Sequence, residues 1–280
     1  MNRRKMLAGI AVTGLGPGVA RGVARPHLRV MSFNVRLPMD SDGPNRWDAR
    51  RDLFVETIRS AAPDIIGTQE LWKIQGEWIM AKLPGFAWFG VGRRGGDSDE
   101  HMGVFYRSDR LRVIERGDFW LSDTPTQPGS ISWGHPHPRM ATWGLFETVP
   151  EGERFWFINT HFPHRPESEA ARQKAATQIA AWVAARPSGD PVVLTGDFNT
   201  IPDSVPHRIL SATLADAWLT AAERAGSEGT SHGFSGVARR RIDWIMARGL
   251  EPVRVRTIDR GEDGLWPSDH FPVVAEYRWP

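Results

Sequence analysis

Residues 191–199 read Pro191-Val192-Val193-Leu194-Thr195-Gly196-Asp197-Phe198-Asn199. The unbroken apolar run predicts a buried strand over residues 191–195. In extended geometry the side chains of Asp197 and Asn199 lie on one face of the strand, while Phe198 points into the core. The alternative for this segment taken alone is an Asx turn that closes the strand.

Five other segments repeat this pattern and place an acid, an amide or an imidazole where an apolar strand ends. They are Phe33-Asn34, Thr68-Gln69-Glu70, Asn159-Thr160-His161, Arg241-Ile242-Asp243-Trp244 and Pro267-Ser268-Asp269-His270-Phe271. An Asx turn at one strand does not account for the other five. The six segments together predict that side chains far apart in the sequence meet at one rim of the fold.

The spacing of apolar residues predicts strands and helices along the whole chain. Strands are expected over residues 27–35, 64–68, 102–107, 112–119, 141–149, 154–159, 191–195, 241–247, 253–258 and 271–277, and helices over 46–61, 166–186 and 204–211. A loop rich in proline, glycine and serine covers residues 121–138. This order favours an α/β fold, a four-layer sandwich of two mixed, mostly antiparallel sheets covered by helices.

The first 24 residues differ from the remainder of the chain. Arg3-Arg4-Lys5 precedes a weakly apolar, glycine-rich run with small residues at Ala20 and Ala24. The run is too short and too rich in glycine for a bilayer-spanning helix, which takes ~20 apolar residues. It resembles a twin-arginine export signal and predicts passage through the twin-arginine translocation machinery to a periplasmic or secreted location. The alternative is an uncleaved anchor or a disordered start. Residues 25–280 are expected to form a single, monomeric domain.

Charge and composition limit the kinds of substrate. Residues 1–24 hold four basic side chains and no acid, so the rest of the chain has 31 basic and 33 acidic residues. A nonspecific DNA-binding protein is expected to carry a basic excess. A small or exposed phosphoester is therefore favoured over nucleic acid. The sequence has no cysteine, which excludes disulfides, thiolate metal sites and cysteine nucleophiles.

Three of the strand-end residues offer oxygen ligands for a hard cation. Mg²⁺ prefers one or two carboxylates and completes its shell with water and substrate phosphate. Glu70 is the main candidate, and Asn34 and Asp269 are expected to assist. For Glu70 alone, the alternative is an ordinary surface acid after a strand.

The other strand-end residues suit catalysis at phosphorus. Asp197 and Asn199 can orient an attacking water or a phosphate oxygen. His161 and His270 can donate hydrogen bonds to phosphoryl oxygens as negative charge builds. Asp243 is expected to orient His270, because such an imidazole needs a carboxylate on its other nitrogen.

These segments resemble the motifs of the endonuclease/exonuclease/phosphatase superfamily, from about residue 27 to residue 277. The motifs are Ser32-Phe33-Asn34, Gln69-Glu70, Asn159-Thr160-His161, Gly196-Asp197-Phe198-Asn199, Ile242-Asp243-Trp244 and Ser268-Asp269-His270. The resemblance implies a four-layer α/β sandwich, one or two Mg²⁺ or Mn²⁺ ions, and in-line attack of water on phosphorus. It also implies that Glu70 binds the metal with help from Asn34 and Asp269. It implies that Asp197 and Asn199 position the attacking water and the phosphate, and that His161 and His270 contact the phosphoryl oxygens.

The chain also resembles a bacterial subgroup of this superfamily. Its marks are Gly43-Pro44-Asn45-Arg46-Trp47, Phe119-Trp120-Leu121-Ser122, Arg139-Met140-Ala141-Thr142-Trp143 and His232-Gly233-Phe234. Arg139 follows the long loop and could clamp phosphate, with a solvated surface arginine as the alternative.

Two departures narrow the choice within the superfamily. Apurinic endonucleases place a tyrosine in the site, whereas Tyr106 and Tyr277 here lie in strand-like runs. Inositol-polyphosphate 5-phosphatases carry a proline-alanine-tryptophan-cysteine signature where this chain has Arg239-Arg240-Arg241-Ile242-Asp243.

Three functional hypotheses follow. The favoured one is an exported, metal-dependent phosphoesterase acting on a sugar phosphate, a phosphodiester headgroup or a cell-envelope fragment. The second is an extracellular nuclease. The third is a catalytically silent binding module of the same fold, which the full set of acids and imidazoles argues against.

Overall fold

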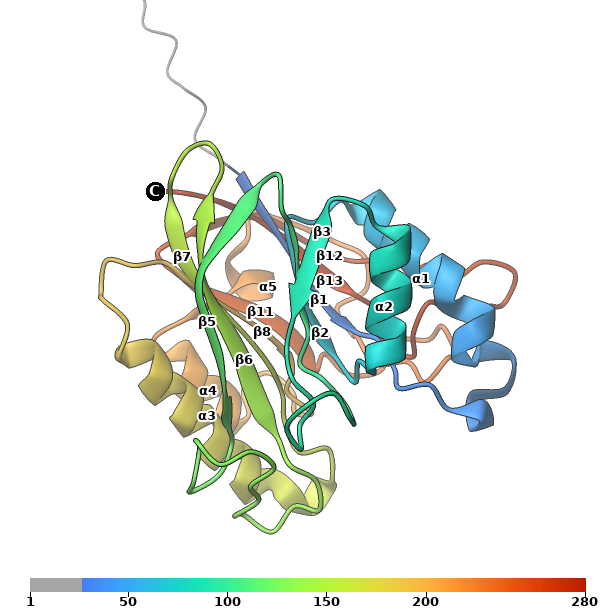
Figure 1. The fold of residues 1–280 in the computed structure, drawn as a ribbon, viewed down its shortest axis with the longest axis horizontal. Helices are drawn as coiled ribbons and strands as arrows, with labels where there is room; N and C mark the ends of the chain where they lie inside the picture. Colours follow the sequence, from blue (N-terminus) through green and yellow to red (C-terminus); the bar gives the residue numbers. More distant parts are fainter. Residues whose placement is uncertain (1–26) are drawn as a thin grey trace, which may run out of the picture.

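The computed structural model describes residues 27–280, and the predicted export signal over residues 1–24 lies outside this part. Within residues 27–280, no helix combines the length and the apolar character needed to cross a bilayer. Two sheets pack face to face and helices cover both outer faces (Figure 1). The four-layer fold predicted from the sequence is confirmed.

Both sheets are mixed and mostly antiparallel, as predicted. The first has the order β10-β12-β13-β1-β2-β4-β3, and its parallel pairs are β1–β2 and β10–β12. Its strands are β1 (His27–Asn34), β2 (Ile65–Gln69), β3 (Phe86–Phe89), β4 (Val104–Arg107), β10 (Glu223–Ala225), β12 (Glu251–Thr257) and β13 (Val273–Arg278). The second has the order β5-β6-β7-β8-β11-β9, and β7–β8 is its parallel pair. Its strands are β5 (Leu111–Trp120), β6 (Met140–Thr148), β7 (Arg154–His161), β8 (Val192–Asp197), β9 (Ala215–Asp216) and β11 (Asp243–Arg248).

Alternating side chains along each strand divide the core into three layers. In β1, Val30 faces the space between the sheets, while Met31 faces the helices α1 (Trp47–Ala61) and α2 (Lys73–Lys82). In β8, Val193 faces the other sheet, while Leu194 packs beneath α3 (Glu169–Ala184) and α4 (Val205–Ser211). The remaining short elements are α5 (Ala217–Thr220) and the 3-10 turns η1 (Asp40–Asn45) and η2 (Pro166–Ser168).

The structure differs from the sequence-based elements in a few places. α2 and β3 were not predicted, because residues 71–101 contain seven glycine or proline residues and little apolar periodicity. The helix expected over residues 166–186 begins as the 3-10 turn η2 and continues as α3. Residues 121–138 form a loop, as expected.

Strand register brings the polar strand ends to one edge of the sandwich. The parallel pair β1–β2 aligns Asn34 with Gln69, one residue before Glu70, and the parallel pair β7–β8 aligns His161 with Asp197. β11 runs antiparallel to β8, so its first residue, Asp243, lies opposite Asp197. β13 runs antiparallel to β1, so its entry segment, which carries Asp269 and His270, reaches the same edge.

The two sheets approach each other closely next to this edge. The Asn159 side-chain amide of β7 donates to the carbonyl oxygens of Thr68 (2.7 Å) and Gly103 (3.2 Å) in the other sheet. Its Oδ1 accepts from Gln69 Nε2 (2.7 Å) and Thr195 Oγ1 (3.1 Å). A Cβ atom at Gly67 would lie 2.1 Å from Thr195 Oγ1, so only glycine fits between the sheets.

We expect Gly67→Ala to destabilise the fold by about 1–3 kcal/mol, because the added methyl group must displace Thr195 or Asn159. Urea unfolding followed by circular dichroism measures this change. Gly189→Ala is the matched control, since Gly189 is exposed and nothing lies within 4 Å of its Cβ position. Equal free energies of unfolding for the two variants would contradict the close approach of the sheets.

Candidate active site

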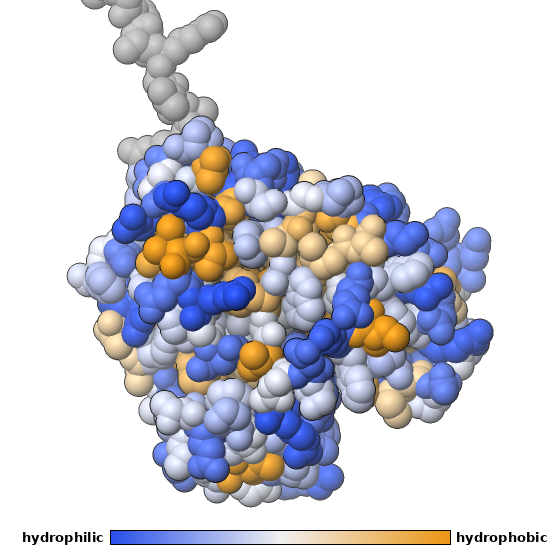
Figure 2. Space-filling view, viewed as in Figure 1, coloured by the Kyte–Doolittle hydropathy of each residue, from blue (hydrophilic) through white to orange (hydrophobic). Residues whose placement is uncertain are grey.

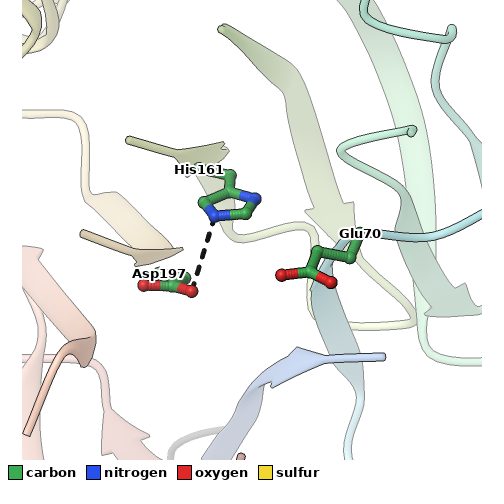
Figure 3. Close-up of side chains that lie close together, drawn as sticks. All are labelled: Glu70, His161 and Asp197. Atoms are coloured by element: carbon green, nitrogen blue, oxygen red, sulfur yellow. Dashed lines mark ion pairs between the residues drawn. The ribbon is translucent and has the colours of Figure 1, made fainter. Parts of the chain in front are cut away.

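Glu70, His161 and Asp197 meet at the shared edge of the two sheets. Each offers a ligand atom, and these atoms lie within 4.8 Å of one another (Figure 3). Asp197, Asp243 and His270 form a second such group, and Asp197 belongs to both. The residues predicted from separate segments therefore gather in one place.

Asn34 connects the two sheets at this point. Its Nδ2 donates to Glu70 Oε1 and to Asp197 Oδ2, both at 3.1 Å. Its Oδ1 accepts the backbone N–H of Arg36 at 2.9 Å. The amide nitrogen thus faces the carboxylates, and Asn34 would have to turn its oxygen inward to ligate a cation, so its role as a ligand stays a prediction.

The extended geometry predicted for Asn199 is wrong. Asn199 has a φ of 51°, and its backbone N–H donates to Asp197 Oδ1 at 2.9 Å, which is the Asx turn considered as the alternative. The turn still aims the side chain at the site. Asn199 Nδ2 lies 3.0 Å from His161 Nε2 and donates to the carbonyl oxygen of Phe162. Since this nitrogen is a donor, His161 Nε2 is the acceptor and a neutral His161 carries its proton on Nδ1.

The two histidines of the site have opposite electrostatic environments. Burial opposes a charge on His270, but Asp243, whose Oδ2 lies 2.8 Å from His270 Nδ1, and Asp197 together hold the pKa of His270 well above its usual value. Burial and the nearby Arg139 hold the pKa of His161 well below its usual value. At neutral pH the site therefore contains one charged and one neutral imidazole.

Glu100 is a further site residue, which the sequence pattern does not reveal. Its Oε2 lies 3.9 Å from His161 Nδ1 and 3.8 Å from Arg139 Nη1. These distances are too long for direct hydrogen bonds, and all three atoms are buried without a hydrogen-bond partner among the described residues. No signal in the sequence marks Glu100, because it follows a glycine-rich loop rather than an apolar strand.

Arg139 is not the solvated surface residue considered as its alternative. Only 4% of it is exposed, and its Nη2 lies 3.2 Å from His164 Nδ1. Of the triple arginine, Arg239 and Arg240 are exposed, while Arg241 is buried against Asp216 with 2.7 Å between Nη1 and Oδ2.

The remaining predicted ligand, Asp269, lies next to the charged histidine. Burial raises the pKa of Asp269, and the charge of Glu70 adds to this against the opposing charge of His270. Ser268 fixes the segment by donating from Oγ to the carbonyl oxygen of Asn34 at 2.6 Å.

The donor set suits a hard divalent cation. Burial, together with the charges of Asp243 and Glu70, raises the pKa of Asp197 to about 7. A cation bound between such carboxylates reduces their mutual repulsion. Carboxylate oxygens are also the ligands that Mg²⁺ prefers. Glu70 and Asp197 would hold the ion, with Asp269 beside them.

The outline of the molecule is notched on one side (Figure 2). In the space-filling view the outline is notched between the part that carries α1 and α2 and the lower end of the six-stranded sheet (Figure 2). Most of this face is hydrophilic, with hydrophobic residues in separate groups. Glu70, Asn199 and Asp269 are partly exposed, so a polar substrate can approach the site from solvent.

The chain is similar to known proteins in sequence and in structure. The family model described as the endonuclease/exonuclease/phosphatase family matches residues 31–270. A mannosyl-6-phosphatase of Bacteroides thetaiotaomicron is 31% identical, with a TM-score of 0.83 over 90% of this chain and 100% of the other. An endonuclease/exonuclease/phosphatase protein of Bacteroides vulgatus is 30% identical, with a TM-score of 0.87 over 91% and 100% of the two chains. Protein L388 of Acanthamoeba polyphaga mimivirus is 30% identical over 169 residues, and the match spans 55% of this chain and 60% of the viral protein.

We expect Glu70→Gln to remove stabilisation by Mg²⁺ without weakening the metal-free fold. The charge of Glu70 raises the pKa values of the buried acids Asp197 and Asp269, after the larger effect of burial, so its loss relieves repulsion. At a hundredfold excess over Kd, Mg²⁺ should raise the Tm of the unaltered protein by roughly 5 °C. Differential scanning calorimetry with and without Mg²⁺ measures both effects.

Glu77→Gln, at an exposed position of α2, is the matched control and should keep the full response to Mg²⁺. An undiminished Tm increase in Glu70→Gln would exclude Glu70 as a ligand.

Proposed function

The chain belongs to the endonuclease/exonuclease/phosphatase family, whose members are phosphoester hydrolases, and we propose that it is an exported, divalent-metal-dependent phosphoesterase. Its substrate is a small or exposed phosphoester, with a sugar phosphate as the favoured class. Water attacks phosphorus in line with the leaving alcohol. Export rests on the twin-arginine pattern of residues 1–24 alone.

The observation that carries this proposal is the pair of unlike imidazoles on either side of Asp197. His270 Nδ1 lies 3.9 Å and His161 Nε2 3.5 Å from Asp197 Oδ2. His270 is held charged by Asp243, so it can donate to a phosphoryl oxygen as negative charge develops there. His161 is held neutral and fixes the side chain of Asn199.

Asp197 is placed to orient the attacking water and to accept its proton. Its Oδ2 lies near Asn34 Nδ2, His161 Nε2 and His270 Nδ1, so the carboxylate is fixed at the centre of the site. A divalent cation, when bound, would supply positive charge to the phosphoryl oxygens. Asn199 and Arg139 are proposed to position the ester's remaining oxygens.

Two observations support a small substrate. The similar protein from Bacteroides thetaiotaomicron is named a mannosyl-6-phosphatase. Residues 25–280 carry two more acidic than basic side chains, whereas tight nonspecific binding of DNA requires several uncompensated cations.

A panel of substrates tests the proposal. With Mg²⁺ or Mn²⁺ we expect hydrolysis of p-nitrophenyl phosphate, bis-p-nitrophenyl phosphate or a hexose phosphate, and little cleavage of plasmid DNA, because no basic surface excess retains a polyanion. Phosphate or p-nitrophenol release is followed by absorbance, and DNA on gels. Cleavage of DNA at rates matching the small esters would favour the nuclease, and inertness toward every substrate would favour the silent binding module.

We expect Asp243→Asn to lower kcat by about 100-fold and to shift the pH profile. In the unaltered protein the raised pKa of His270 keeps the active, charged form present above neutral pH. Without the Asp243 charge this pKa falls, so the alkaline limb of kcat/KM moves to lower pH. Asp52→Asn, at an exposed position of α1, should leave the profile unchanged.

A drop in activity without movement of the alkaline limb would show that Asp243 does not act through the charge of His270.

A further inference from the structure

Next to the phosphate-binding centre lies a second group of side chains, His137, Arg139 and His164, which we name the imidazole face. Arg139 joins it to the site, because its Nη1 lies 3.8 Å from Glu100 and its Nη2 lies 3.2 Å from His164 Nδ1. The rings of His137 and His164 stack, with 6.2 Å between centroids and 22° between planes. His164 is exposed and His137 is partly exposed.

The imidazole face is held in place by the buried scaffold beneath it. His164 follows β7 in the turn that leads to α3, and Arg172 of α3 donates to the carbonyl oxygens of Pro163 (2.9 Å), Arg165 (2.8 Å) and Pro166 (3.3 Å) in that turn. On the other side, His135 Nδ1 lies 2.6 Å from the carbonyl oxygen of His137. A site fixed before binding loses less entropy when the ligand arrives.

Acids lie close to the arginines beneath the imidazole face. The guanidinium group of Arg93 lies 2.9 Å from carboxylate oxygens of both Asp99 and Glu100. The other carboxylate oxygen of Glu100 lies 3.8 Å from Arg139 Nη1. Burial and the charge of Arg139 lower the pKa of His164. Burial and the charges of Arg93 and Arg139 lower the pKa of His137.

The hydrogen bond from Arg139 determines which ring nitrogen of His164 carries the proton. Arginine can only donate, so His164 Nδ1 is the acceptor and its proton is on Nε2. Among the described residues no hydrogen bond to this Nε2 is formed, and the residue is exposed. The two histidines of the imidazole face therefore present neutral hydrogen-bonding groups and flat rings beside the place of phosphate binding.

We propose that the imidazole face is the subsite for the leaving alcohol and that it recognises the hydroxyl groups of a sugar. This inference rests on the proposed phosphoesterase function and adds the residues that select its substrate. Neutral imidazoles donate to and accept from hydroxyl groups, and their rings pack against the C–H face of a pyranose. A second phosphate or a nucleic-acid backbone would require exposed, uncompensated cations, whereas Arg139 is buried and lies 3.8 Å from the carboxylate of Glu100.

The test compares two substrates in four proteins. The ratio of kcat/KM for a hexose 6-phosphate to kcat/KM for p-nitrophenyl phosphate is measured in the unaltered protein, His164→Ala, His137→Ala and His27→Ala. Loss of one hydrogen bond to a hydroxyl group should lower this ratio about tenfold in His164→Ala and less in His137→Ala. His27→Ala is the control, since His27 is exposed at the opposite end of β1.

Inhibition by inorganic phosphate distinguishes the subsite from the phosphate-binding centre. The inhibition constant should change far less in His164→Ala than the substrate ratio does. A ratio within twofold of the unaltered value in both variants, or an equal change in the inhibition constant, would overturn the inference while leaving the proposed function intact. Hydrolysis of bis-p-nitrophenyl phosphate but of neither monoester would overturn the inference alone. Failure of the unaltered protein to hydrolyse any of the three esters would overturn the proposed function itself.

Discussion

The site depends on the close approach of the two sheets beside Gly67. Stacked sheets are normally about 10 Å apart, filled by apolar side chains, and carboxylates on separate sheets would then not meet. Here Gly67 has no side chain to fill the space between the sheets, and the side-chain amide of Asn159 donates hydrogen bonds to backbone carbonyl groups of the opposite sheet. The sheets can therefore meet through hydrogen bonds, and Asn34 can contact Glu70 and Asp197 at once.

Two buried arginines hold the loops next to the site in place. Arg50 donates to the carbonyl oxygens of Asn45, Val35, Pro267 and Arg36, at 2.7–2.8 Å. Burial lowers the pKa of Arg50 to about 10, which leaves it charged at neutral pH. Arg172 likewise donates to the carbonyl oxygens of Pro163 and Arg165 in the turn after β7. Loop carbonyls have no ladder partner, and a guanidinium group with five donors satisfies several of them together.

The sequence reveals the parts of the site that follow local rules. An apolar run that ends in Asp197 or Glu70 is visible in one segment. Parallel register then aligns Asp197 with His161 and brings Glu70 next to the end of β1. Glu100 and His164 depend instead on contacts between distant loops, which leave no periodic pattern. The φ of 51° at Asn199 is likewise set by the hydrogen bond from its own N–H to Asp197, so alternation along a strand could not predict it.

The charges of the site can be counted in pairs. The charge of His270 is paired with that of Asp243, and the charge of Arg139 is paired with that of Glu100. Arg36 and Arg50 lie near Asp42 and Asp269. Glu70 and Asp197 remain without a full positive charge of their own, and Asp197 is buried while Glu70 is half-buried. A divalent cation bound between them would supply the missing positive charge and favour the ionised form of Asp197. An anionic ester can enter among these acids only when that charge is present, so cation and substrate are expected to bind cooperatively, each reducing the electrostatic cost of the other.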